Sequence, residues 1–183
     1  MFSFRKRLLY PVHVEKRDPL FAQVMMEHYG GRDSEFSAAA QYLNHRLNMP
    51  NKYVRELLGM IAAEELSHME MIGLAVSKLG CSVNYVNAQG APWSKDYLDQ
   101  CIDPIMMLGA DIETEARSRE LYQEHIKIAD DPGIKRMLNF LAGREEVHQR
   151  LFEKAQKMII KNAPQDPFAH LIYEYKMSLQ VLE

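Results

Sequence analysis

Two sets of residues with metal-ligand chemistry repeat along the chain with the same spacing. Each set has a glutamate, a second glutamate 30 residues later, and a histidine three residues after that. The members are Glu35, Glu65 and His68 in the first set, and Glu115, Glu145 and His148 in the second. Residues three apart point to the same side of a helix, so each Glu-x-x-His pair can hold one cation. One pair alone is a weak indication, whereas two in register predict a dinuclear site.

The two sets lie on helical patterns that are copies of each other. Steps of four and three residues over 54–79 and over 134–159 select apolar positions, interrupted only by the Glu and His of each motif. This pattern is typical of the buried side of a bundle helix. Every position in the second stretch lies 80 residues after its counterpart. The same offset relates Glu35 to Glu115, Tyr42 to Tyr122 and His45 to His125. We interpret the chain as a duplicated helix pair whose metal site straddles a pseudo-two-fold axis.

Capping residues and breakers predict the helices that carry these sets. A short helix follows Asp18-Pro19 and ends at Gly30-Gly31, and longer helices are expected at about 35–49, 51–79, 104–129 and 132–161. Residues 81–103 lack periodicity and should form a crossover, residues 1–18 an extended arm, and residues 162–183 a tail with a short helix from Phe168 to Leu182. Four long helices with one long central connection describe an all-α, ferritin-like four-helix bundle. We expect one such domain over residues 1–183.

The composition agrees with a helix-rich globule and excludes several classes of protein. Hydrophobic residues make up 47% and charged residues 26% of the 183 positions. A net charge of −3 without a block of like charges gives no basis for nucleic-acid binding. Cys81 and Cys101 form no Cys-x-x-Cys pair, which disfavours a disulfide framework and a rubredoxin-type iron site. Without a signal core or a long apolar run, we expect cytoplasmic synthesis and no membrane contact.

The six candidate ligands favour a particular class of metal. Burying four ionised carboxylates in one layer is very costly unless cations neutralise them. Four carboxylates and two imidazoles without a thiolate suit manganese or iron better than copper or a structural zinc. The spacing does not separate manganese from iron.

Polar residues close to the motifs are assigned other roles. Glu64, Glu70 and Glu146 do not lie on the apolar side of their helices, so we expect them in solvent or in surface ion pairs. Asp111 lies one turn before Glu115, so it is the main rival ligand or a hydrogen-bonding neighbour of the site.

Aromatic residues and histidines further along the helices are more ambiguous. Tyr42 and Tyr122 lie about 10 Å along the helix from the carboxylates, where hydrogen bonding to the metal layer and core filling are equally open. His45 and His125 are expected to make structural hydrogen bonds. His28 belongs to no recognisable constellation.

Longer motifs around the two sets carry a family resemblance. They are residues 27–31 (EHYGG), 38–44 (AAAQYLN), 64–72 (EELSHMEMI) and 144–148 (REEVH), and with the opening LYPVHV they extend over about residues 8–160. These motifs resemble the manganese-containing catalases, and the short spore-coat members most of all. The resemblance implies disproportionation of hydrogen peroxide by two manganese ions, a homo-oligomer, and a place in the spore coat with other coat proteins as partners.

The resemblance also implies that the two copies have different roles. Glu35 and His68 would bind one manganese ion, Glu115 and His148 the other, and Glu65 would bridge the two.

Two further residues would act without binding the metals. Glu145 would lie beside metal-bound solvent, accept a proton from peroxide and return one when the O–O bond breaks. Tyr42 would tune or gate the site. The chain lacks the extended C-terminal tail of the long catalases and has a short crossover, and both segments shape the access channel and subunit contacts in that family.

Two other functions remain open. The first is a di-iron ferroxidase or peroxidase of the ferritin-like class, although the chain lacks the Cys-x-x-Cys electron-transfer module expected of the peroxidase form. The second is a structural coat protein whose metal site serves only folding or assembly.

Overall fold

The computed structural model describes residues 9–180, and helices account for most of them. The α-helices are α1 (Pro19–Gly30), α2 (Glu35–Asn48), α3 (Lys52–Leu79), α4 (Pro104–Ile128), α5 (Pro132–Ile160) and α6 (Gln165–Gln180). Between α3 and α4 lie a single bridge that joins Val86 to Pro92 and a short 3-10 helix, η1 (Lys95–Tyr97). The expected all-α, ferritin-like bundle is confirmed.

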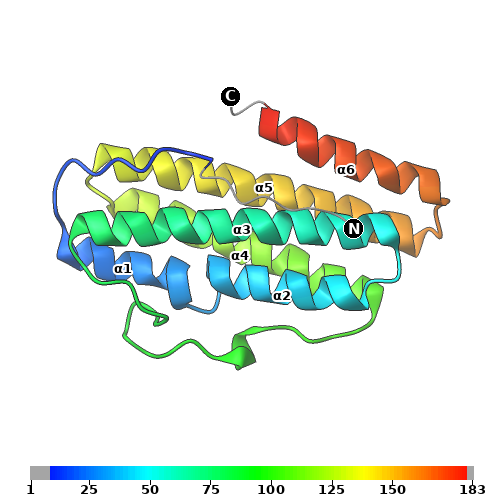
Figure 1. Ribbon diagram of the computed structural model, residues 1–183, viewed down its shortest axis with the longest axis horizontal. Helices are drawn as coiled ribbons and strands as arrows, with labels where there is room; N and C mark the ends of the chain where they lie inside the picture. Colours follow the sequence, from blue (N-terminus) through cyan, green and yellow to red (C-terminus); the bar gives the residue numbers. More distant parts are fainter. Residues whose placement is uncertain (1–8, 181–183) are drawn as a thin grey trace.

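The helices form two pairs joined by a long connection (Figure 1). α2 packs mainly on α3, and α4 packs mainly on α5. α1 and α2 lie end to end beside α3, and residues 81–103 run from one end of the bundle to the other. Because this crossover returns the chain to the end at which α3 began, α3 and α4 run parallel.

Side chains at the helix starts explain where the elements begin. Asp18, Ser34, Asn51, Asp103 and Asp131 each accept hydrogen bonds from backbone amides in the first turn of the following helix. Ser34 caps α2 by accepting from the backbone amide of Ser37. Gly80 ends α3 with a left-handed backbone at φ 110°, a conformation that glycine adopts readily and that residues with a Cβ atom disfavour.

The two ends of the chain differ in how they meet the bundle. Residues 9–18 form neither helix nor strand, and the Lys78 ammonium donates to the carbonyl of Val12 at 2.6 Å. At the other end α6 begins at Gln165 instead of Phe168, because Pro167 falls in the first turn, where proline is tolerated. The first eight residues of the expected arm and the expected helix end at Leu182 lie outside the described residues.

Two apolar clusters fill the bundle and leave a polar layer between them. One contains Met25, Ile72, Tyr122 and Leu138, and the other contains Tyr42, Leu58, Leu108 and Phe152. All eight side chains are fully buried. The candidate ligands lie between these clusters, in the middle of α3, α4 and α5 and, for Glu35, at the first residue of α2. In residues 9–180, none of the helices has the length and apolar character needed to span a membrane.

Candidate metal centre

The six glutamates and histidines selected from the sequence meet in the bundle interior. Each has at most 1% of its surface exposed. Their ligand atoms form two sets, within each of which all atoms lie within 4.8 Å of one another. One set contains Glu35, Glu65, His68 and Glu145, and the other contains Glu65, Glu115, Glu145 and His148. Two neighbouring positions for a cation therefore share two carboxylates.

Glu65 lies between the two imidazoles. Its Oε2 is 2.9 Å from Nδ1 of His68, and its Oε1 is 2.7 Å from Nδ1 of His148. The rings of the two histidines are stacked with centroids 5.9 Å apart. Each oxygen of one carboxylate thus faces a different histidine.

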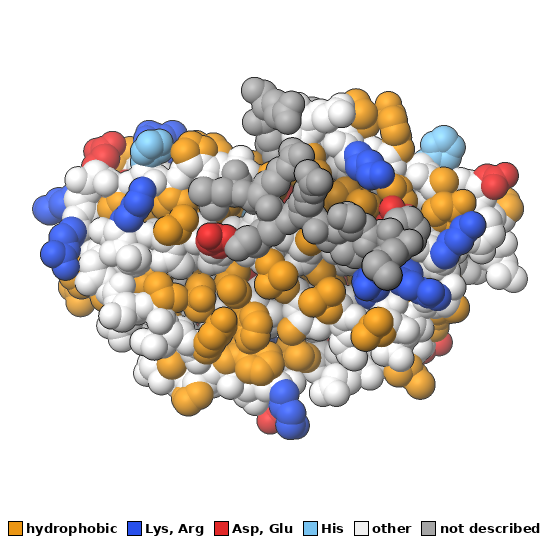
Figure 2. Space-filling model, in the orientation of Figure 1, with side chains coloured by type: hydrophobic (Ala, Val, Ile, Leu, Met, Phe, Trp, Pro, Cys, Tyr) orange, Lys and Arg blue, Asp and Glu red, His pale blue; other side chains and the backbone are white. Residues whose placement is uncertain are grey.

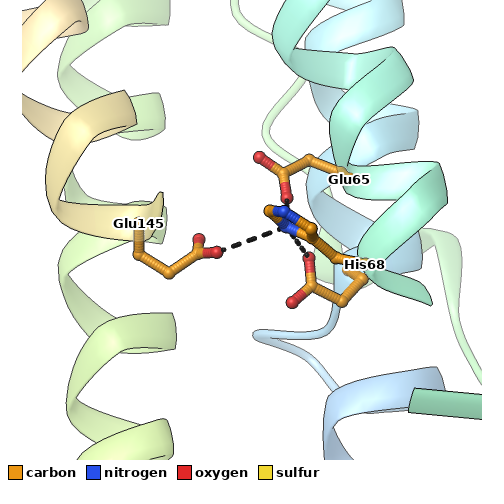
Figure 3. Close-up of side chains that lie close together, drawn as sticks. Glu65, His68 and Glu145 are labelled. Atoms are coloured by element: carbon orange, nitrogen blue, oxygen red, sulfur yellow. Dashed lines mark hydrogen bonds and ion pairs between the residues drawn. The ribbon is translucent and has the colours of Figure 1, made fainter. Parts of the chain in front are cut away.

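Glu145 enters the same layer from α5 on the opposite side (Figure 3). Its Oε1 is 3.6 Å from Nδ1 of His68, which is longer than either contact of Glu65. Glu145 belongs to both sets of ligand atoms, so proximity alone does not exclude it as a ligand.

Several atoms in this layer lack hydrogen-bond partners, which is the signature of a cation site. Among the described residues, the buried atoms that make no hydrogen bond include Oε2 of Glu115 and Oε1 of Glu145, while Oε1 of Glu65 and Nδ1 of His148 lie 2.7 Å apart but not in hydrogen-bond geometry. Unpaired buried polar atoms of this kind are costly. Hard divalent cations accept carboxylate and imidazole ligands, so the residues present fit two manganese or iron ions.

The electrostatics of the layer agree with this interpretation. Burial is the largest influence on Glu35 and raises its pKa to about 8, partly offset by His68. Burial, followed by the charges of Glu65 and Glu115, raises the pKa of Glu145 well above its usual range. Glu65 moves the other way, because the charges of His148 and His68 outweigh burial and lower its pKa. A layer that must protonate some carboxylates by itself is one that cations would stabilise.

The two tyrosines hydrogen-bond across the bundle to the carboxylates of the opposite copy. The hydroxyl of Tyr42 donates to Glu115 at 2.7 Å, and the hydroxyl of Tyr122 donates to Glu35. Both rings are fully buried and also belong to the apolar clusters. Each tyrosine therefore does both things that the sequence left open: it hydrogen-bonds to the metal layer and it fills the core. The family resemblance gave a role at the site to Tyr42 alone, but Tyr122 occupies the equivalent position in the other half.

The expectation that Glu64 lies in solvent or in a surface ion pair was wrong, because its ion pair is buried. Only 4% of Glu64 is exposed, and its carboxylate accepts hydrogen bonds from Arg144 at 2.6 and 3.3 Å. Its two oxygens also lie 3.4 Å from Nε2 of His68 and 3.1 Å from Nε2 of His148. The adjacent basic residue in the second motif was the signal for this pair, because Arg144 lies 80 residues after Glu64.

Asp111 is a hydrogen-bonded neighbour and lies outside both sets of ligand atoms. Its Oδ1 is 2.8 Å from Nδ1 of His45 and accepts from Gln41 at 2.9 Å. The structural role expected for His45 is therefore confirmed.

His28 is not isolated, contrary to the sequence-based interpretation. It is fully buried, stacks on Tyr122 with ring centroids 4.1 Å apart, and places Nε2 2.7 Å from Nδ1 of His125. Its sequence context gave no signal, because the position 80 residues later is the apolar Leu108. The contact also gives His125 a hydrogen-bond partner, as expected.

Known proteins share both the sequence and the fold. The family model for manganese-containing catalase matches residues 1–84 and 80–180. Protein CotJC of Bacillus subtilis is 37% identical over 180 residues, which cover 87% of this chain and 95% of that protein. A probable manganese catalase of Clostridium acetobutylicum is 33% identical over 178 residues, with 85% and 79% covered.

Solved structures give the same answer. KatB, a manganese catalase from Anabaena, superposes with a TM-score of 0.80 at 32% identity, covering 87% of this chain and 81% of KatB. A bacterioferritin from Rhodobacter capsulatus, at 21% identity and a TM-score of 0.69, shares the fold, with 85% and 94% covered. The chain belongs to the manganese-containing catalase family.

Proposed function

We propose that this protein disproportionates hydrogen peroxide to water and dioxygen at a dimanganese centre. The observation that carries the proposal is the buried pair of ligand sets, which share two carboxylates and leave ligand atoms unpartnered. In the balanced reaction, one peroxide loses two electrons and two protons to give dioxygen, and a second peroxide gains them to give two waters. Two manganese ions supply the two-electron store when bound, each changing by one oxidation state.

The ligands would be divided between the two copies. Glu35 and His68 would hold one ion, Glu115 and His148 the other, and Glu65 would bridge them. The contact of each Glu65 oxygen with a different imidazole supports the bridging role.

Glu145 would handle protons. It enters the layer from the side opposite Glu65, and within residues 9–180 its one ion-pair contact, to His68, is long. From there its carboxylate can take a proton from incoming peroxide and return it to the leaving oxygen, which is the usual work of a positioned general acid and base.

Tyr42 and Tyr122 would hold Glu115 and Glu35 in place through their hydroxyl groups. Because each tyrosine reaches from one copy to the other, the two helix pairs stabilise each other's ligands. Tyr42 would in this way tune the site.

The wider setting of the protein is also a proposal. We propose that it forms a homo-oligomer and is located in the spore coat, in line with the resemblance to the short spore-coat members of the family. Immunogold labelling of spore sections in the source organism, with a deletion strain as the control, tests the location. Size-exclusion chromatography with light scattering tests the oligomer.

Oxygen evolution tests the activity. We expect manganese-loaded protein to release dioxygen from added peroxide without an electron donor. Metal analysis of protein from cells grown with both metals should find manganese. Iron in the site and no dioxygen would instead favour a ferroxidase, and bound metal without any peroxide consumption would favour a structural coat protein.

A further inference from the structure

Glu64 and Arg144 form a buried ion pair directly behind the two imidazoles. Arg144 is 3% exposed, and its Nε donates to Oε1 of Glu64 at 2.6 Å. A buried ion pair gives little net stability, because desolvation offsets the attraction between the charges. Stability alone is therefore a poor reason for this pair to be here.

The position of Glu64 suggests a better reason. Nδ1 of both His68 and His148 faces the ligand layer, as the contacts with Glu65 show. A histidine that binds a cation through Nδ1 must keep its proton on Nε2, and that N–H requires an acceptor. One carboxylate oxygen of Glu64 lies 3.4 Å from Nε2 of His68 and the other lies 3.1 Å from Nε2 of His148; both are ion-pair distances, and neither contact has hydrogen-bond geometry.

The carboxylate is itself held from the outside. Arg144 contacts Ser178 of α6 twice, its Nη1 donating to the carbonyl at 3.3 Å and its Nη2 to the hydroxyl at 3.1 Å. Tyr175 of the same helix donates to the carbonyl of Met60 on α3 at 3.2 Å. The terminal helix thus closes the layer behind Glu64.

We propose that Glu64 is a positioning residue that orients both histidine ligands at once, with Arg144 fixing its carboxylate. This inference rests on the proposed dimanganese function. It assigns the pair to the metal centre, whereas the ligand set alone leaves both residues without a role.

Manganese affinity separates this role from a purely structural one. In Glu64→Gln the side chain keeps its shape but loses its charge, so we expect Mn²⁺ affinity, measured by competition with a chelator, to fall roughly 10–100-fold, the range found for such outer partners. The electron paramagnetic resonance signal of the coupled Mn(II) pair should change as well. Glu146→Gln is the matched control, because Glu146 is exposed on α5 and should leave both readouts unchanged.

A second variant separates a loss of manganese affinity from a loss of stability. Glu64→Gln alone leaves the Arg144 guanidinium buried without its carboxylate, which can lower the melting temperature. Glu64→Gln/Arg144→Gln removes both charges, so we expect it to regain stability without regaining manganese affinity.

The outcomes differ from those that would overturn the proposed function. Recovery of affinity in the double variant, or affinity in Glu64→Gln within about twofold of the unmodified protein, would overturn the positioning role. Unmodified protein that binds Mn²⁺ but evolves no dioxygen would contradict only the catalase function. Failure of the unmodified protein to bind Mn²⁺ at all would overturn both.

Discussion

The two copies of the helix pair supply the same ligand types but surround them differently. Glu65 touches both imidazoles, whereas Glu145, at the equivalent position, reaches only His68 and at 3.6 Å. Glu64 and Arg144 are also equivalent positions, and they pair as opposite charges. Two identical residues could not have formed this ion pair. The duplication accounts for the repeated ligand types, and the departures from it are the basis of the roles proposed for the individual residues.

Differences extend beyond the ligands. In the first copy His45 lies against Asp111, and in the second His125 lies against His28. One imidazole therefore faces a carboxylate and its counterpart faces another imidazole. The position equivalent to His28 is Leu108, an apolar residue in the opposite cluster.

The largest effect is expected where the two copies are most alike. His68→Ala and His148→Ala each remove one imidazole ligand, so we expect both to lose manganese and activity by more than the roughly 100-fold that outer partners can give. Metal analysis and oxygen evolution check this. Retention of full manganese content by either variant would remove that histidine from the ligand set.

A smaller and equal effect is expected for the two tyrosines. Tyr42→Phe and Tyr122→Phe each remove one hydrogen bond to a carboxylate, worth about 1.5–3 kcal/mol when the partner is charged. We expect a fall of roughly 10–100-fold in manganese affinity for each, since about 1.4 kcal/mol is tenfold. If only Tyr42→Phe impairs turnover while both leave affinity unchanged, the tyrosines do not share a structural role and Tyr42 alone acts on the reaction.

The histidine pairs should respond to pH in opposite directions. Burial lowers the pKa of His45, but Asp111 and Asp99 outweigh it and leave the pKa raised. Its contribution to stability is complete below the unfolded value of about 6.5 and is lost as pH rises through the folded pKa. We therefore expect His45→Gln to lower the melting temperature of metal-free protein more at pH 6 than at pH 9.

The pKa of His28 is shifted in the opposite direction. Burial, and then the charge of His125, lowers its pKa, so the folded protein stays neutral there while the unfolded chain takes up a proton. Stability should fall as pH drops below about 6.5, and His28→Leu should remove part of that fall. Differences of a few degrees are expected, because about 1 kcal/mol shifts the melting temperature of a chain this size by roughly 2–4 °C. Parallel pH dependences for the two variants would contradict this contrast.

The smallest effect concerns the helix starts that precede the two motifs. Asn51 and Asp131 are equivalent caps, but Asp131 also accepts from the amides of Glu15 and Lys16, at 2.6 and 3.2 Å. We expect Asn51→Ala to cost about 1 kcal/mol, as typical caps do, and Asp131→Ala to cost more. Thermal denaturation checks the order, and equal losses would mean that the arm adds nothing.

Asp131 adds a pH dependence that Asn51 lacks. Burial acts to raise its pKa, but the hydrogen bonds from backbone amides prevail and lower it. Its contribution should be present above the unfolded value of about 4 and should disappear as pH falls through the lower folded pKa.

Much of the fold could be predicted from the sequence because the residues that start and end helices act locally. Asp18-Pro19, Asp103-Pro104 and the pair at Asp131-Pro132 place helix starts within a residue or two, since capping and proline act within one turn. The 80-residue repeat then predicted two copies of a helix pair that share one metal site. The helix expected from Phe168 starts three residues earlier, at Gln165, because Pro167 lies in the first turn, where proline is tolerated.

The site was predicted less completely outside the apolar seam. Periodicity identifies residues that face the core, and so it found Glu65 and His68. Glu64 was misplaced because periodicity puts it off the seam, whereas α6 covers that flank of α3 and buries it. His28 was missed because its partners, Tyr122 and His125, are distant in the sequence. Contacts of this kind depend on how helices pack, which no local pattern encodes.

The central claim is that Glu65 and Glu145 have diverged into a bridge and a proton carrier. Manganese content and oxygen evolution, measured together on Glu65→Gln and Glu145→Gln, test it most directly. We expect Glu65→Gln to lose manganese, and Glu145→Gln to keep both ions while its dioxygen release falls by roughly 10²–10⁴, the usual contribution of a general acid or base. Equal loss of manganese from the two variants, or full activity in Glu145→Gln, would contradict the divergence.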